Sequence, residues 1–124
     1  MVVKILCVLT SDEHGFYLPE IAHPFHRFKA AGFDVDICSI KGGKAPVSPQ
    51  SIDLTDEENK NFYETESIWK QTENTATLSS YDASAYDGVF YVGGFGTMWD
   101  FPESPVNNIY ILQDFSSNLI FSHS

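Results

Sequence analysis

The chain has 124 residues, and its seven lysines and arginines against seventeen aspartates and glutamates give a formal net charge of −10. Hydrophobic residues make up 43% of it, which fits one folded domain over residues 1–124 and excludes a disordered chain. The acidic balance disfavours nucleic acids and anionic membranes, because both attract a basic surface. No apolar run reaches the roughly 20 residues of a membrane span, and the N-terminus lacks a signal-peptide pattern. We therefore expect a cytoplasmic protein, small enough to enter the nucleus as well.

The first predicted elements are a buried strand and a helix. Val2–Thr10 is a nearly continuous apolar and β-branched run, which is typical of a strand covered on both faces of a parallel sheet. In residues 20–32 apolar side chains recur at helical spacing, with Pro24 expected in the first turn and Gly32 just past the last turn. The apolar stripe of this helix consists of Ile21, Phe25 and Phe28.

The second strand and the second helix follow. Phe33–Ser39 completes a β-α-β unit, which implies parallel strands with a right-handed connection. After a loop rich in glycine and proline, Thr55 with Glu58 three residues later forms a capping-box pattern. The helix that starts there is polar apart from Phe62 and Trp69, so we expect it to face solvent.

The last part of the chain predicts an irregular segment at 73–88, a third strand at Asp87–Val92, a helix at 104–117 and a fourth strand at Asn118–Phe121. The helix prediction rests on the spacing of Ile109, Leu112 and Phe115. Strands that alternate with helices indicate an α/β fold. We expect a parallel sheet of three or four strands, with the first strand between the second and the third.

Candidate functional residues lie where the strands end, because ligands of open α/β sheets bind beyond the carboxyl ends of the strands. Gly93, Gly94 and Gly96 follow the third strand, and glycine allows the backbone to approach a ligand closely. Their pattern is neither a dinucleotide fingerprint nor a P-loop, and a purely structural corner remains an alternative. Glu20 opens the first helix at the same edge, where a carboxylate is ordinarily a helix-dipole residue.

Histidines and cysteines predict neither a metal site nor a disulfide. His23 and His26 lie on one helix flank without an apparent third ligand, and His14 lies apart from them in the sequence. Cys7 and Cys38 both fall inside apolar strands, which indicates buried, reduced thiols.

Two segments, PEIAHPFHRFKAAGFDVDICS (19–39) and LSSYDASAYDGVFYVGGFGTMWDFPESP (78–105), resemble the glutathione-independent glyoxalases. These enzymes are the stress-induced, chaperone-like branch of the PfpI-type superfamily. The resemblance covers residue 1 to about residue 105, but only about the first half of a family member. The resemblance implies a flavodoxin-like three-layer α/β sandwich. It also implies a protein that often dimerises, and an enzyme that converts methylglyoxal to lactate without glutathione, metal or other cofactor.

The resemblance also implies roles for residues. Glu20 corresponds to a glutamate that hydrogen-bonds the thiol of a catalytic cysteine, and Gly93, Gly94 and Gly96 to a corner that lines the pocket. The family's cysteine stands in a Cys-His-Gly turn, where this chain reads NLIFSHS, and Phe95 replaces a usual histidine. A serine nucleophile there is disfavoured, because a nucleophile elbow needs a following helix.

We therefore expect a glyoxalase-like chain, by class a carbon–oxygen lyase, that has lost turnover because the cysteine region is missing. A small 2-oxoaldehyde is the expected ligand, and a homodimer is possible in this family. The alternative is a holdase-like or dimer-forming module that binds through an exposed apolar sheet edge. A phosphate-binding protein ranks last, because no lysine or arginine lies near the glycines.

Overall fold

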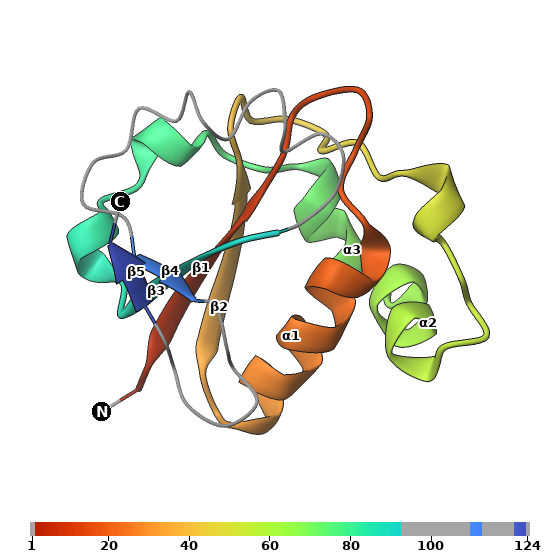
Figure 1. Cartoon of the computed structure of the whole chain (residues 1–124), viewed down its shortest axis with the longest axis horizontal. Coiled ribbons are helices and arrows are strands. Elements are labelled where there is room, and N and C mark those ends of the chain that lie inside the picture. The colour runs from red at the N-terminus through yellow and green to blue at the C-terminus, as the bar shows by residue number, and fades with distance from the viewer. Residues whose placement is uncertain (1, 93–109, 113–120, 124) are drawn as a thin grey trace.

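A five-stranded sheet with the order β2-β1-β3-β4-β5 forms the centre of the protein (Figure 1). The computed structural model describes residues 2–92, 110–112 and 121–123. The strands are β1 (Lys4–Leu9), β2 (Asp34–Ser39), β3 (Gly88–Tyr91), β4 (Tyr110–Leu112) and β5 (Phe121–His123). Because β1 pairs in parallel with both β2 and β3, the predicted α/β fold with a central first strand is confirmed.

The far edge of the sheet differs from the prediction. Residues 110–112 form β4, which pairs in parallel with β3, so the helix predicted at 104–117 is wrong for this part. The rest of that predicted helix lies outside the described residues. The run Ile109–Leu112 is rich in β-branched and aromatic residues, which favour strands, and periodicity alone cannot assign so short a run.

The last strand differs from the prediction in its direction. Strand β5 covers Phe121–His123 and pairs antiparallel with β4. Of the predicted range Asn118–Phe121, only Phe121 belongs to the described residues. The sheet is therefore mixed at this edge instead of parallel throughout.

Helix α1 spans Leu18–Ala30 and begins before the predicted start. Pro19 occupies the first turn, whereas Pro24 lies inside the helix, so the placement of Pro24 in the first turn is wrong. The N–H of Leu18 donates to Oγ of Ser51 at 2.9 Å, and Ser51 lies 33 positions further along the chain. The sequence could not reveal the start of the helix, because a distant side chain stabilises it.

The end of α1 agrees with the prediction. Gly32 has a φ of 83°, and its N–H donates to the carbonyl of Lys29 at 3.0 Å. The N–H of Phe33 donates to the carbonyl of Phe28, also at 3.0 Å, and the two rings stack with centroids 6.0 Å apart. This pattern is a Schellman motif with its hydrophobic contact, and it needs a left-handed residue at Gly32.

Helix α2 spans Glu57–Glu64, and its N-cap is Asp56 instead of the predicted Thr55. Asp56 Oδ1 accepts from the N–H of Asn59 at 2.9 Å. The hydroxyl of Thr55, one residue earlier, is directed away from the helix and donates to Asp53 Oδ1 at 2.6 Å.

The predicted second helix is also interrupted. Thr65, with a ψ of 108°, ends α2 and precedes α3 (Glu66–Glu73). In a continuous helix, residues seven apart are separated by about 10 Å along the axis. The rings of Phe62 and Trp69 lie 6.1 Å apart, and Phe62 is 1% exposed. The break places Phe62 in the core and packs the partly buried Trp69 against it, so the expectation of a solvent-facing helix is wrong for these two residues.

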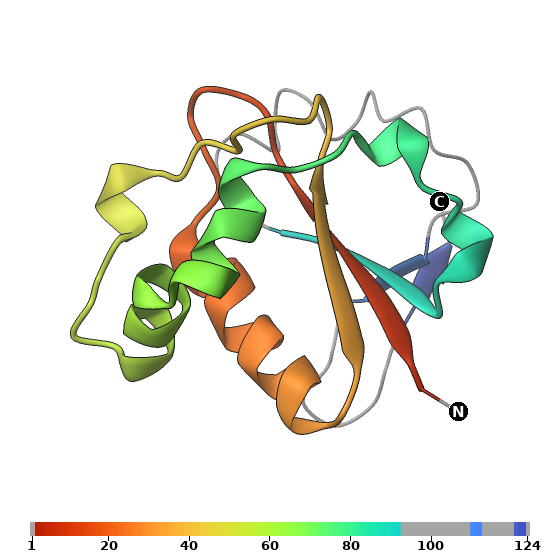
Figure 2. The ribbon, with the colours of Figure 1, turned by 180° about the vertical axis from the view of Figure 1, so that it is seen from behind.

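The two faces of the sheet are covered differently. Helices α1, α2 and α3 lie on one side, and residues 78–86 lie on the other (Figures 1 and 2). Alternate residues of β1 supply the two cores: Ile5, Cys7 and Leu9 belong to the helix side, and Leu6 and Val8 to the opposite side.

The segment opposite the helices is irregular, as predicted. It contains two 3₁₀ turns, η2 (Leu78–Ser80) and η3 (Ala83–Ala85), and Leu78 packs on the sheet with Tyr81 and Tyr86. Nowhere in residues 2–92, 110–112 and 121–123 is a helix both long and apolar enough to cross a membrane.

We predict that acid destabilises the protein through four surface aspartates whose pKa lies below its ordinary value of 3.8: Asp12, Asp53, Asp56 and Asp82. The pKa of Asp53 is lowered by the hydroxyl and the N–H of Thr55, and that of Asp82 by the hydroxyl and the N–H of Ser84. A lowered native pKa gives stability that is present above about pH 4 and is lost as the pH falls through the native values.

The measurement is the urea midpoint at pH 6 and pH 3 for the natural chain and for the double variant Asp53→Asn, Asp82→Asn. The natural chain should lose more stability than the variant on acidification. An equal loss in both would contradict this assignment.

Candidate functional site

The site predicted from the sequence lies at the carboxyl edge of the sheet, and two loops there hold each other in place. The N–H of Lys41, in the loop after β2, donates to Ser11 Oγ at 2.8 Å. The N–H of Phe16 donates to the carbonyl of Pro46 at 2.9 Å, and the N–H of Ser48 to the carbonyl of Phe16 at 2.8 Å. The loop that leads into α1 is therefore fixed by the loop after β2.

Gly15 makes this contact between the loops possible. Its φ is 84°, and a Cβ at this position would lie 2.6 Å from the backbone of both Val47 and Ser48. Only a residue without a side chain fits a left-handed conformation against another backbone.

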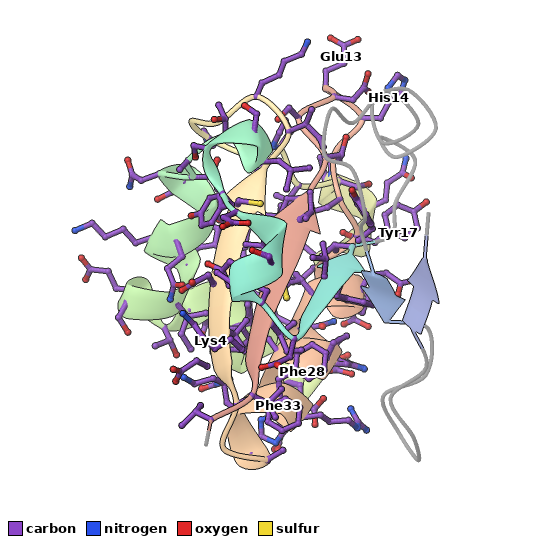
Figure 3. All side chains as sticks on the ribbon, turned by 90° about the vertical axis from the view of Figure 1, so that its left-hand side faces the viewer. Lys4, Glu13, His14, Tyr17, Phe28 and Phe33 are labelled. Atoms are coloured by element: carbon purple, nitrogen blue, oxygen red, sulfur yellow. The ribbon has the colours of Figure 1, made fainter. Side chains whose placement is uncertain are left out.

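The tip of the first loop carries an aspartate–histidine pair that the sequence analysis missed. Asp12 Oδ1 accepts from the N–H of His14 at 2.9 Å and also contacts Nδ1 of the His14 ring. Figure 3 shows His14 and Glu13 at one end of the molecule and Lys4, at the start of β1, toward the other. The spacing of Asp12 and His14, with one residue between them, is typical of an Asx turn and was the available signal.

Glu20, the predicted catalytic residue, belongs to helix α1. It is exposed, lies in the first turn of α1, and donates its N–H to the carbonyl of Tyr17 at 3.0 Å. Because Pro24 has no N–H, the carbonyl of Glu20 lacks its usual α-helical donor. Glu20 thus presents an accessible carboxylate just beyond the loop that follows β1.

The glycine corner lies outside the described residues. Val92 is the last described residue of this region, fully buried, with its N–H donated to the carbonyl of Val8 at 3.0 Å. Gly93, Gly94 and Gly96 follow it in the sequence, together with Phe95. Of the four predicted site residues, only Glu20 is therefore placed.

His23 and His26 join two helices. His23 Nε2 lies 3.0 Å from Asp56 Oδ2, and His26 Nε2 lies 3.8 Å from Glu58 Oε2. Arg27 Nη1 adds a contact of 3.6 Å to Glu58 Oε1. These contacts connect α1 to the start of α2. In the part of the chain that the structure describes, no three histidine, cysteine, aspartate or glutamate side chains gather as a possible metal site.

Both cysteines are free and buried, as predicted. Cys38 is paired in register with Val8, the neighbour of Cys7, so the two thiols lie on opposite faces of the sheet. Burial raises the pKa of the Cys7 thiol strongly, with smaller effects of Cys38 and Asp36, and burial raises the pKa of Cys38 to about 12. A protonated thiol inside a strand is not a nucleophile.

We predict that neither thiol reacts with a disulfide reagent such as DTNB while the protein is folded at pH 7.5. Both should react fully when urea unfolds the chain, since reaction requires an accessible thiolate. The measurement is the number of thiols released before and after addition of urea. One fast-reacting thiol in native protein would contradict the buried placement.

Ser122 and His123 lie in strand β5, where they pair with Ile111 and Tyr110 of β4. A nucleophile elbow is a sharp turn between a strand and a helix, whereas this backbone is part of a ladder. The backbone here gives no support to a serine nucleophile.

The fold defines the class of protein. The strand order β2-β1-β3-β4-β5, with β1 parallel to both β2 and β3 and a crossover helix after β1, is that of flavodoxin-like α/β proteins. No family model matches the chain.

Individual proteins are similar to it. The glutathione-independent glyoxalase HSP31 of Saccharomyces cerevisiae is 29% identical over 128 residues, which cover 94% of this chain and 52% of the relative. The structure of the Rapid Encystment Protein 24 kDa of Francisella tularensis has a TM-score of 0.77 and 31% identity, over 84% of this chain and 50% of that one. Glyoxalase III of Candida albicans has a TM-score of 0.72 and 26% identity, over 82% and 48%.

The comparisons confirm the resemblance to glutathione-independent glyoxalases that the sequence predicted. The chain spans about half the length of these relatives. This agrees with the predicted resemblance to about half of a family member.

Proposed function

We propose that this chain carries the glutamate side of a glyoxalase-like site and binds a small 2-oxoaldehyde such as methylglyoxal without converting it to lactate. One observation carries the proposal: Glu20 is exposed at the start of α1, whereas the chain's two cysteines are fully buried in strands. The chain thus presents the carboxylate but no accessible cysteine thiol.

The chemistry explains why turnover is lost. Conversion of a 2-oxoaldehyde to a hydroxy acid in this class begins when a thiolate adds to the aldehyde. Glu20 could then move a proton between neighbouring carbons, but it has no adduct on which to act. Removing the nucleophile of a coupled catalytic site costs on the order of 10⁶-fold in rate. Binding alone does not lower the barrier.

The proposed binding is tested by two-dimensional ¹H–¹⁵N NMR with hydroxyacetone, an unreactive analogue of methylglyoxal. We expect saturable shifts of the loop at residues 10–17 and of the first turn of α1. Glu20→Gln should weaken binding, whereas Glu66→Gln, an exposed carboxylate in the first turn of α3, should not. Equal binding by both variants would contradict a role of Glu20.

The alternative, a holdase-like module, requires an exposed apolar surface. Within residues 2–92, the exposed large hydrophobic residue is Val2, at 52%. A single exposed side chain is ordinary for a monomeric protein, so these residues give no support to that alternative. Suppression of aggregation of a heat-denatured client protein would test it directly.

The remaining expectations from the sequence stay predictions. They are homodimer formation, the absence of nucleic-acid and membrane partners, and a cytoplasmic or nuclear location.

A further inference from the structure

Ser51 belongs to the 3₁₀ turn η1 (Pro49–Ser51), which lies beside the start of the helix that carries Glu20 (Figures 1 and 2). Its hydroxyl donates to the carbonyl of Ser48 at 2.7 Å, and its Oγ accepts from the N–H of Leu18 at 2.9 Å. Because the proton is turned toward Ser48, the oxygen is an acceptor toward Leu18. Ser51 thus serves the helix as the side chain of an N-cap residue ordinarily does, but from a distant segment.

The start of α1 has no side-chain cap of its own. Its N-cap residue is Tyr17, whose side chain makes no capping hydrogen bond, whereas a good N-cap carries a short side chain with an acceptor oxygen. Pro19 has no N–H, and the N–H of Glu20 donates to the carbonyl of Tyr17 at 3.0 Å. The N–H of Leu18 is therefore the donor of the first turn that takes its partner from outside the helix, and Ser51 supplies that partner.

Glu20 lies in a part of the helix that its own backbone holds weakly. Pro24 has no N–H for the carbonyl of Glu20, and the ring of a proline inside a helix crowds the carbonyl four residues earlier. Pro19 removes a second N–H from the same turn. With fewer hydrogen bonds inside the helix, the position of Glu20 depends more strongly on the contact with Ser51.

The segment that carries Ser51 is itself fixed against the loop before the helix. The N–H of Ser51 donates to the carbonyl of Ser48 at 3.0 Å, and the N–H of Ser48 donates to the carbonyl of Phe16 at 2.8 Å. The N–H of Phe16 donates to the carbonyl of Pro46 at 2.9 Å. Hydrogen bonds therefore join this segment to the chain on both sides of the N-cap, at Phe16 and at Leu18.

We propose that Ser51 is a positioning residue for Glu20. Its hydroxyl sets where the first turn of α1, and with it the carboxylate, lies relative to the loop at residues 10–17. The consequence for ligand binding rests on the function proposed above, whereas the placement of the turn does not depend on a ligand. A binding group has to be held within about 0.5 Å of its productive position, so a small displacement of this turn weakens binding.

Three variants separate this role from a general loss of stability. Ser51→Ala removes the hydroxyl, and Ser51→Thr retains it. Ser80→Ala is the matched control, because Ser80 ends the turn η2 as Ser51 ends η1, and its hydroxyl donates to the carbonyl of Thr77, three residues earlier, also at 2.7 Å. The turn η2 lies on the side of the sheet opposite α1 (Figures 1 and 2).

The first measurement needs no ligand. Residual dipolar couplings of the N–H bonds of Glu20, Ile21 and Ala22 report how the first turn is oriented relative to β1 and β2. We expect these couplings to change in Ser51→Ala and to keep their natural values in Ser51→Thr and in the control variant. A merely stabilising hydroxyl would lower the urea midpoint of Ser51→Ala but leave the couplings of the folded protein unchanged, and that result would overturn the proposal.

The second measurement is the affinity for hydroxyacetone by ¹H–¹⁵N NMR. Ser51→Ala should bind roughly fivefold more weakly, because loss of an N-cap shifts a helix start by about this factor and the apparent affinity follows the fraction of competent molecules. Ser51→Thr and Ser80→Ala should bind within twofold of the natural chain. Equal affinity of Ser51→Ala and Ser80→Ala, or a threonine that fails to restore the couplings, would also overturn the proposal. If the natural chain did not bind hydroxyacetone, the proposed function would fail, and the couplings would still decide the role of Ser51.

Discussion

Replacement of Phe62 by alanine is expected to lower the free energy of unfolding by about 4 kcal/mol, as is typical when a buried phenylalanine is truncated. Phe62 is 1% exposed and lies in α2. Its ring makes edge contacts with Phe25 of α1, at 5.2 Å between centroids, and with Trp69 of α3, at 6.1 Å. The residue thus holds three helices together, and its loss leaves a cavity among them.

Urea unfolding of Phe62→Ala beside Lys60→Ala provides the measurement. Lys60 is exposed on the same helix, so its replacement should change the stability by no more than about 0.5 kcal/mol. A cost below about 1.5 kcal/mol for Phe62→Ala would contradict the packing of α2 against α1 and α3.

Replacement of Gly15 by alanine is expected to cost roughly 3 kcal/mol, the upper end of the range for a non-glycine residue forced into a rare backbone conformation. The φ of 84° accounts for part of the cost. The remainder comes from the contact at 2.6 Å between the added Cβ and the backbone of Val47 and Ser48, which must move apart.

Gly32→Ala is the matched control for the free-energy cost of the left-handed backbone conformation. Gly32 has a nearly identical φ of 83°, but no atom lies within 4 Å of an added Cβ. We expect a cost of about 1 kcal/mol for it, from conformation alone. Chemical denaturation of both variants gives the comparison, and equal costs would show that the two loops are not in close contact.

The sequence was sufficient to predict the structural elements that depend on local patterns. The continuous apolar run of β1 reflects burial on both faces of the sheet, and such runs identify parallel strands. The stop at Gly32 was also predictable, because a left-handed glycine after an amphipathic helix is a local feature. The irregular stretch opposite the helices followed from its polar composition.

The errors arose where a distant or competing contact decides the structure. Ser51 stabilises the start of α1 from far along the chain, so Pro24 was assigned to the wrong turn. Thr55 matched the pattern of an N-cap, but its hydroxyl donates to Asp53, and Asp56 accepts from the N–H of Asn59 as the N-cap.

The candidate site was predictable only in part. Glu20 was found because it belongs to a motif that resembles a known family, and the structure gives it an exposed position in a first helical turn.

The central claim is that the chain keeps Glu20 but buries both of its cysteine thiols, and lactate formation from methylglyoxal tests it most directly. The purified chain and its Glu20→Gln variant are assayed side by side, with an active glutathione-independent glyoxalase as positive control. We predict that the natural chain forms no more lactate than the variant, because Cys7 and Cys38 are buried in β1 and β2. Lactate formation that Glu20→Gln abolishes would contradict the account.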